Sequence, residues 1–158
     1  MASKKSLAPG EHIICVNRHA RHNYFIDEVY EAGLVLVGSE VKSLRDGKAN
    51  LVDSYARIQK GEAFLVNSHI SPYPGANQFN HEPTRTRKLL LHFREIERLT
   101  GKTKERGLTL IPLKLYFKNG RAKVELGLAR GKKLYDKRET LKRKMAEREV
   151  ERSLKARH

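Results

Sequence analysis

The 158-residue sequence contains one cysteine, Cys15, and no long run of apolar residues. A lone cysteine cannot form an intramolecular disulfide, so the fold does not depend on one. A helix that spans a bilayer needs about 20 consecutive apolar residues, and no segment approaches that length. The first twelve residues, MASKKSLAPGEH, lack the apolar centre of a signal peptide. Together these absences predict a cytoplasmic protein.

The motifs that would indicate an enzyme are also missing. No phosphate-binding loop of the GxxxxGK[ST] type and no nucleophile elbow occurs. The proximity of Asp53 and Ser54 in the sequence does not establish a catalytic triad, because a triad is defined by geometry. Cys15, His19 and His22 match no zinc-binding spacing. We therefore expect no catalytic residues, no metal site and no cofactor.

Positive charge is what the sequence has in excess. Lys and Arg number 33 against 18 Asp and Glu, which gives a formal net charge of +15. Such an excess raises the local concentration of polyanions, and each neutralised nucleic-acid phosphate also releases condensed counterions. Nucleic acid is therefore the expected partner. An anionic membrane surface is the competing possibility.

Short strands dominate the pattern of the first 130 residues. HIICVN and GLVLVG are β-branched or apolar runs of strand length. Alternating runs flank two turn signals, Lys60-Gly61 and Asn119-Gly120, and each pair predicts a hairpin. Pro112 lacks a backbone N–H, which indicates a bulge or a sheet edge at that position.

Two helices are expected among these strands. A short helix follows Ser39 as its N-cap and stops at Gly47. A longer one includes Leu89 and Leu99, which fall near helical spacing, and ends at Gly101. About six short strands with one main helix between the hairpins predict a mainly β fold with short helices, in the form of an OB-type, partly open β-barrel. An α+β sandwich is the alternative.

The segment 131–158 is strongly basic and contains no proline. Its apolar residues fall on two opposite helical faces, so it has no continuous stripe with which to dock on a barrel. An isolated helix of this kind is marginal in water. We expect residues 1–10 to be a flexible leader, 11–130 the barrel, and 131–158 a disordered tail that becomes helical on a polyanionic partner. A solvated solubility tail is the alternative.

Cations and aromatic rings are interleaved in the stretch NRHARHNYF. Arg18, His22 and Tyr24 suit stacking and phosphate contacts, although the rings could equally belong to the core. The cluster TRTRK, residues 84–88, precedes the predicted main helix, where cations oppose the helix dipole and anion binding is favoured. Glu31 either forms an ion pair or accepts hydrogen bonds from a base edge.

Several longer stretches are distinctive when taken together, namely NRHARHNYFI, EAGLVLVGSEVKSLRDGKANLVDSYA, GEAFLVNSHISPY, PTRTRKLLLH and GLTLIPLKLYFKNGRAKVELGLARGKKLYDKR. They resemble the small protein B family, the SsrA-binding proteins of bacterial trans-translation. The resemblance extends over essentially the whole chain, in order and without large gaps. The blocks EVKSLR, RKLLLH and GKKLYDKR are specific to that family.

The resemblance implies an OB-type barrel that binds the tRNA-like domain of transfer-messenger RNA and enters the vacant A site of a stalled ribosome. The tail then lies in the empty mRNA channel as a helix against small-subunit rRNA. Elongation factor Tu is an indirect partner through the aminoacylated RNA. The resemblance further implies a monomer that catalyses nothing. From the residues alone, a structural ribosomal protein and an RNA-processing enzyme remain as alternatives.

Two sets of site residues follow. The family resemblance implies RNA binding by Asn17, Glu31, Leu91 and Lys123. The basic and aromatic pattern adds Arg18, His22 and Tyr24. For the decoding site and the mRNA channel, the resemblance implies Lys132, Lys133, Tyr135, Asp136, Lys137 and Arg138. Some relatives carry histidine at the position of Tyr135, and tyrosine keeps the ring for stacking.

Overall fold

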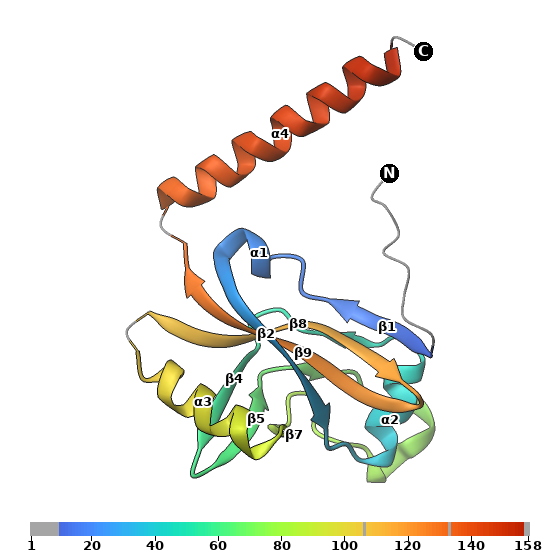
Figure 1. Cartoon of the computed structure of the whole chain (residues 1–158). Helices are drawn as coiled ribbons and strands as arrows, with labels where there is room; N and C mark the ends of the chain where they lie inside the picture. Colours follow the sequence, from blue (N-terminus) through green and yellow to red (C-terminus); the bar gives the residue numbers. More distant parts are fainter. Residues whose placement is uncertain (1–9, 106, 133, 157–158) are drawn as a thin grey trace.

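The computed structural model describes residues 10–156 apart from Arg106 and Lys133, without the side chains of 77–78 and 134–136. A β-sheet forms the body, and one long helix projects from it (Figure 1). The seven strands of the main sheet are β1 (Glu11–Val16), β2 (Tyr24–Leu34), β4 (Tyr55–Gln59), β5 (Glu62–Val66), β7 (Arg87–Leu90), β8 (Leu108–Lys118) and β9 (Arg121–Gly131). The other elements are α1 (Ala20–Asn23), α2 (Gly38–Arg45), β3 (Ala49–Asn50), β6 (His69–Ile70), the 3-10 helix η1 (Pro74–Phe79), α3 (Phe93–Thr103) and α4 (Leu134–Ala156).

The main sheet curls until its end strand β9 pairs with β8, which is next to the strand at the other end. Its strand order is β1-β8-β4-β5-β7-β2-β9, and β9 also pairs with β8. Two of the junctions are short. β4 meets β8 only at Ala56 and Leu110, and β2 meets β7 at two residue pairs. The sheet is therefore partly closed rather than a complete barrel, and the predicted mainly β fold with a partly open barrel is confirmed.

The strongest turn and bulge predictions are confirmed. Asn119 and Gly120 have φ angles of 51° and 78° and connect β8 to β9. The β8–β9 register shifts between Pro112 and Lys114, as expected for a proline that cannot donate to the ladder. Beyond this bulge β8 pairs with β1, from Lys114 to Lys118, whereas its earlier part meets β4. The bulge thus lets one strand contact two different neighbours.

The core lies inside the curled sheet, with α2 and α3 each adding a buried leucine. In β5 and β7, alternate residues point inward, which is the pattern of a strand with one solvated face. Ten leucines, an isoleucine and a valine form the large part of the core cluster: Leu34, Leu44, Leu51, Leu65, Leu89, Leu99, Leu110, Leu115, Leu126, Leu128, Ile70 and Val124.

The region 87–103 differs from the sequence prediction. Arg87–Leu90 is strand β7, paired with β5 and β2, and the helix begins only at Phe93. The backbone N–H of His92 donates to Glu95 Oε1 at 3.1 Å, which caps the helix start. Gly101 does not end this helix, which continues to Thr103. The prediction that Leu89 belongs to the helix was wrong, because a short run of leucines fits the alternating pattern of a strand as well as the spacing of a helix.

The basic cluster TRTRK, residues 84–88, leads into strand β7 and not into a helix, and two of its arginines form ion pairs within the fold. The predicted anion site at a helix start is therefore wrong. Arg87 is fully buried, and its Nε pairs with the buried carboxylate of Glu40 on α2. Arg85 Nη2 lies 2.6 Å from the same carboxylate. Arg87 also donates to the carbonyl oxygens of Ser68 and Pro83 at 2.8 and 3.1 Å. A buried charge needs such partners, and here they tie β7 to α2 and to the preceding loop.

The tail is a continuous helix, α4, where the sequence analysis predicted disorder. Lys, Arg, Glu, Leu and Met are good helix formers, and pairs such as Glu151 and Lys155 have the favourable i,i+4 spacing. The expectation that its apolar side chains do not dock on the barrel is confirmed for the large apolar side chains of α4 that the structure describes, which are between 48% and 66% exposed: Leu141, Met145, Val150 and Leu154. Whether ribosome binding induces this helix stays a prediction. Residues 1–9 of the predicted leader lie outside the described residues.

Candidate nucleic-acid interface

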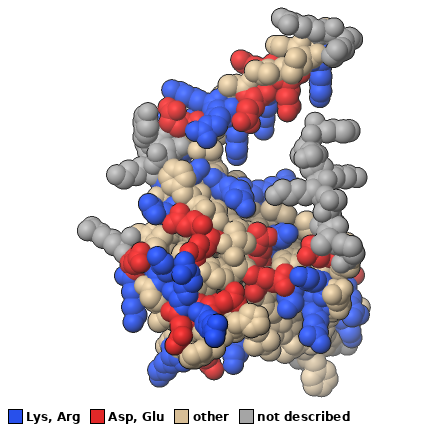
Figure 2. All heavy atoms as spheres, in the orientation of Figure 1, with Lys and Arg blue, Asp and Glu red and all other residues tan. Residues whose placement is uncertain are grey.

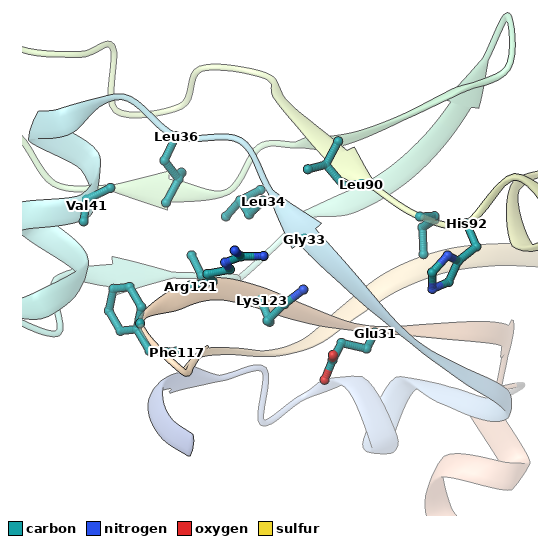
Figure 3. A pocket seen from close by; sticks show the side chains of 13 residues that line it. Glu31, Gly33, Leu34, Leu36, Val41, Leu90, His92, Phe117, Arg121 and Lys123 are labelled. Atoms are coloured by element: carbon teal, nitrogen blue, oxygen red, sulfur yellow. The ribbon is translucent and has the colours of Figure 1, made fainter. Parts of the chain in front are cut away.

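A cavity of about 520 Å³ opens at one end of the sheet, beside the β8–β9 turn (Figure 3). Seven of its lining residues are apolar: Leu34, Leu36, Val41, Leu90, Leu91, Phe117 and Ala122. Ionisable side chains surround them: Glu31, His92, Arg121 and Lys123. Three of the predicted RNA-binding residues therefore meet at this cavity: Glu31 from β2, Lys123 from β9 and Leu91 from the connection between β7 and α3. The combination of an apolar floor and a cationic rim suits an unstacked nucleotide.

Glu31 stands on β2 at the rim of this cavity. Its Oε2 accepts a hydrogen bond from the hydroxyl of Tyr116 at 2.5 Å, and both carboxylate oxygens lie 3.4 Å from Lys118 Nζ. The Tyr116 hydrogen bond, helped by Lys118, lowers the pKa of Glu31 below its usual range. The pKa of Tyr116 is raised, first by burial and then by this carboxylate. Glu31 is thus an ionised acceptor at neutral pH.

The other predicted RNA-binding residues lie at the opposite end of β2, around α1. Asn17 is engaged within the fold, because its Nδ2 donates to the carbonyl oxygen of Pro112 at 2.9 Å. Arg18 is exposed, His22 is half-buried, and Tyr24 packs against a small apolar cluster. Seven residues of extended strand, the separation of Tyr24 and Glu31, span about 23 Å. The predicted set is therefore split between two ends of the body.

The two neighbouring aromatic rings, Tyr24 and Phe25, lie in different environments, which the sequence left open. Tyr24 is half-buried on the inner side, whereas the Phe25 side chain is 45% exposed. The ammonium group of Lys132 lies 4.9 Å from the centre of the Phe25 ring. One ring therefore faces the core and the other supports a cation on the surface.

Lys132 joins the body to α4. Its backbone N–H donates to the Asn23 carbonyl at 2.8 Å, and its Nζ donates to the Arg21 carbonyl and to Thr140 Oγ1, both at 2.9 Å. These contacts connect the end of β9 to α1 and to the second turn of α4. The family resemblance implies a ribosome contact for Lys132, and the structure adds intramolecular partners that no local pattern indicated.

The remaining predicted tail residues lie along the first turns of α4. Lys137 is half-buried and Arg138 is exposed. Tyr135 and Asp136 belong to the helix, but the structure does not describe their side chains. Lys133 lies outside the described residues. Lys and Arg side chains are interspersed with Asp and Glu on both α4 and the body (Figure 2). The described cations of α4 are exposed apart from Lys137, and Lys144 lines a shallow pocket together with residues of β1, β8 and β9.

Neither a metal-binding cluster nor a membrane-spanning helix is found in the described part of the chain. No group of three or more His, Cys, Asp or Glu side chains within it is arranged to hold a metal ion. Burial raises the pKa of the Cys15 thiol to about 11, which keeps it protonated at neutral pH. No helix among the described residues is both long enough and apolar enough to cross a bilayer.

Comparisons with known proteins identify relatives of this chain. Residues 14–156 match the family model described as SmpB protein. The SsrA-binding protein of Geobacillus thermodenitrificans (strain NG80-2) is 64% identical over 145 residues, which cover 92% of this chain and 94% of that one. The SsrA-binding protein of Desulforudis audaxviator (strain MP104C) is 66% identical over 143 residues, covering 90% and 94%.

A solved structure gives the same result in three dimensions. It is described as "tmRNA-SmpB: a journey to the center of the bacterial ribosome", and it superposes with a TM-score of 0.65 at 55% sequence identity. The superposition covers 76% of this chain and 85% of that chain. The chain belongs to the SmpB family.

Proposed function

We propose that this protein binds transfer-messenger RNA and acts with it in trans-translation on stalled ribosomes. The observation that carries the proposal is its 64% identity, over 92% of its length, to a protein named as SsrA-binding. The net charge of +15 and the cationic cavity support an RNA partner. Action on the bacterial ribosome implies a cytoplasmic location. The proposed role is binding and delivery, with no catalytic step.

The cavity is the proposed contact for the tRNA-like domain. Lys123 and Arg121 are placed on its rim to meet phosphate oxygens, while Leu91 and Phe117 offer apolar surface to a base. Glu31 is the acceptor for an N–H donor on a base edge. A single-stranded or unstacked nucleotide can present a phosphate, a base face and a base edge to the same cavity. A continuous A-form helix cannot, because its bases are stacked and paired.

The proposed role of α4 is to enter the empty mRNA channel of the small subunit. The helix projects from the body (Figure 1), and its described cations are exposed apart from Lys137. Phosphate groups of rRNA are suitable partners for a helix without an apolar stripe, because they bind Lys and Arg on any face. Lys137 and Arg138 are the proposed first contacts near the decoding site, together with Lys133, Tyr135 and Asp136. The aminoacylated RNA would bring elongation factor Tu to the same complex.

Isolation of the protein from cells tests the RNA partner directly. Sequencing of the co-purifying RNA should give one dominant species with a tRNA-like domain. A mixture of rRNA fragments in fixed proportion to ribosomes would instead indicate a structural ribosomal protein and would contradict the proposal.

Salt dependence tests the cavity. Lys123→Ala should weaken binding to the tRNA-like domain and lower the slope of log affinity against log salt by about 1. Lys104→Ala removes the same charge after α3, outside the cavity, and should leave the slope unchanged. Equal slopes for wild type and Lys123→Ala would remove Lys123 from the proposed phosphate contacts.

A further inference from the structure

Two acidic residues are cross-strand neighbours beside the cavity. Glu31 on β2 is the direct cross-strand partner of Glu125 on β9. Like charges in this position repel, so each carboxylate needs its own partner on the third strand, β8. Lys114 on β8 pairs with Glu125 at 3.2 Å, and Tyr116 donates to Glu31. The residues of β8 thus determine where each carboxylate lies.

Tyr116 is a more rigid partner for Glu31 than Lys118. The Tyr116 side chain is almost completely buried, at 3% exposure, and Lys114 Nζ covers its ring at 4.9 Å from the centre. Lys118 is 40% exposed and lies 3.4 Å from the carboxylate. A packed ring with two rotatable bonds fixes a hydroxyl in space, whereas an exposed lysine adds charge without a fixed position.

The alternative partner for Glu31 is Lys123, which lines the same cavity. No ion pair joins Glu31 and Lys123 in the described part of the chain, and their charged ends are directed apart (Figure 3). A carboxylate that swung into the cavity would neutralise a cation needed for phosphate. Tyr116 holds it on the side of β8 instead.

We propose that Tyr116 is a positioning residue for RNA binding, whose hydroxyl holds the Glu31 carboxylate on the cavity rim. Held there, Glu31 is ready to accept an N–H donor of an unstacked base, and Lys123 stays available for a phosphate. This inference rests on the proposed function, because it concerns how the same cavity binds RNA. It assigns a role to a buried residue that makes no direct contact with the ligand.

A double-mutant cycle tests the proposal with full-length protein and the isolated tRNA-like RNA domain. Tyr116→Phe should weaken binding about tenfold, the scale of one hydrogen bond to a charged group. Glu31→Gln should weaken it at least as much, and the double variant should equal Glu31→Gln within about twofold. Additive losses, or wild-type affinity in Tyr116→Phe, would overturn the proposal.

Tyr30→Phe is the matched control. The Tyr30 hydroxyl also donates to a carboxylate, that of Glu28, from the same strand as Glu31 but outside the cavity. Its removal should leave RNA affinity within about twofold of wild type. Glu31→Asp keeps the charge but shortens the side chain beyond the reach of Tyr116, so it should reproduce the loss without altering the buried ring. Full affinity of that variant would count against the proposal.

A carboxyl NMR titration separates positioning from packing. The groups that face Glu31 are Tyr116 and Lys118 on β8, and Lys123 and Glu125 on β9. In Tyr116→Phe the pKa of Glu31 should rise toward its usual value, because its main hydrogen-bond donor is gone. An unchanged pKa would contradict the proposed contact. If wild-type protein did not bind the RNA at all, the proposed function would fail and this inference with it.

Discussion

The body and α4 are stabilised in different ways. The body depends on pairing between distant strands, such as β2 with β9, and on leucines that are fully buried, such as Leu65 and Leu126. In α4 the large apolar side chains that the structure describes are about half exposed or more, and the helix depends on interactions between residues three or four apart. The two regions should therefore respond differently to the same kind of substitution.

The largest expected effect concerns the buried ion pair of the body. Glu40→Gln leaves the guanidinium of Arg87 buried without a countercharge, which should lower the free energy of unfolding by about 3–5 kcal/mol. Glu62→Gln is the control, because Glu62 and Lys88 form an exposed pair 3.3 Å apart that should contribute less than about 1 kcal/mol. Urea denaturation measures both values. Similar losses would mean that burial of the pair is not what matters.

The same leucine-to-alanine change should separate the two regions. Leu126→Ala in β9 creates a cavity in the core and should cost about 2–5 kcal/mol of stability. Leu154→Ala in α4, where the side chain is 57% exposed, should change stability by less than about 0.5 kcal/mol. Thermal or urea unfolding gives the comparison. A large loss for Leu154→Ala would reveal docking of α4 on another surface.

Lys132→Met tests the connection between the regions. The change removes the hydrogen bonds of Nζ to Arg21 and Thr140 and the contact with the Phe25 ring. Stability should fall by about 1 kcal/mol, while the direction of α4 relative to the body becomes variable. Spin labels at Arg57 and Arg148 should show a broader distance distribution than in wild type. Lys137→Met, one turn into α4, should leave the distribution unchanged.

The smallest expected effect is a dependence of stability on pH that comes from an exposed ion pair on the surface of the body. Arg98, with help from Tyr30, lowers the pKa of Glu28 from 4.5 to about 2. The stabilisation by this ionised carboxylate is present above about pH 4.5 and is lost as the pH falls toward 2. Because the pair is exposed, Glu28→Gln should flatten the acid limb of the stability curve only slightly. A shift near neutral pH would contradict the assignment.

Local patterns in the sequence were sufficient for the hairpins and the bulge, because turn residues and proline act on their own backbone. They were insufficient for β7, since a short leucine run fits both strand and helix. They also failed for α4. The lack of an apolar stripe was taken to mean disorder, although the residues of this segment have high helix propensity. Long-range pairing explains the rest. Arg87 gave no local sign that its partner is Glu40, 47 residues earlier.

The candidate site shows the same limit. Glu31, Leu91 and Lys123 were identified through the family resemblance, and the fold brings them together. Tyr116 was missed, because it lies 85 residues from Glu31 and reads as an ordinary strand residue. Only the register of β2, β9 and β8 places its hydroxyl against that carboxylate.

Truncation of the chain after Lys132 tests most directly whether body and tail have separate roles. This variant keeps the backbone hydrogen bond of Lys132 to Asn23 and removes α4 entirely. We predict that its affinity for the tRNA-like domain stays within about twofold of wild type, while trans-translation on stalled ribosomes falls to background. A tenfold or greater loss of RNA affinity would contradict the account, because α4 would then belong to the RNA-binding surface.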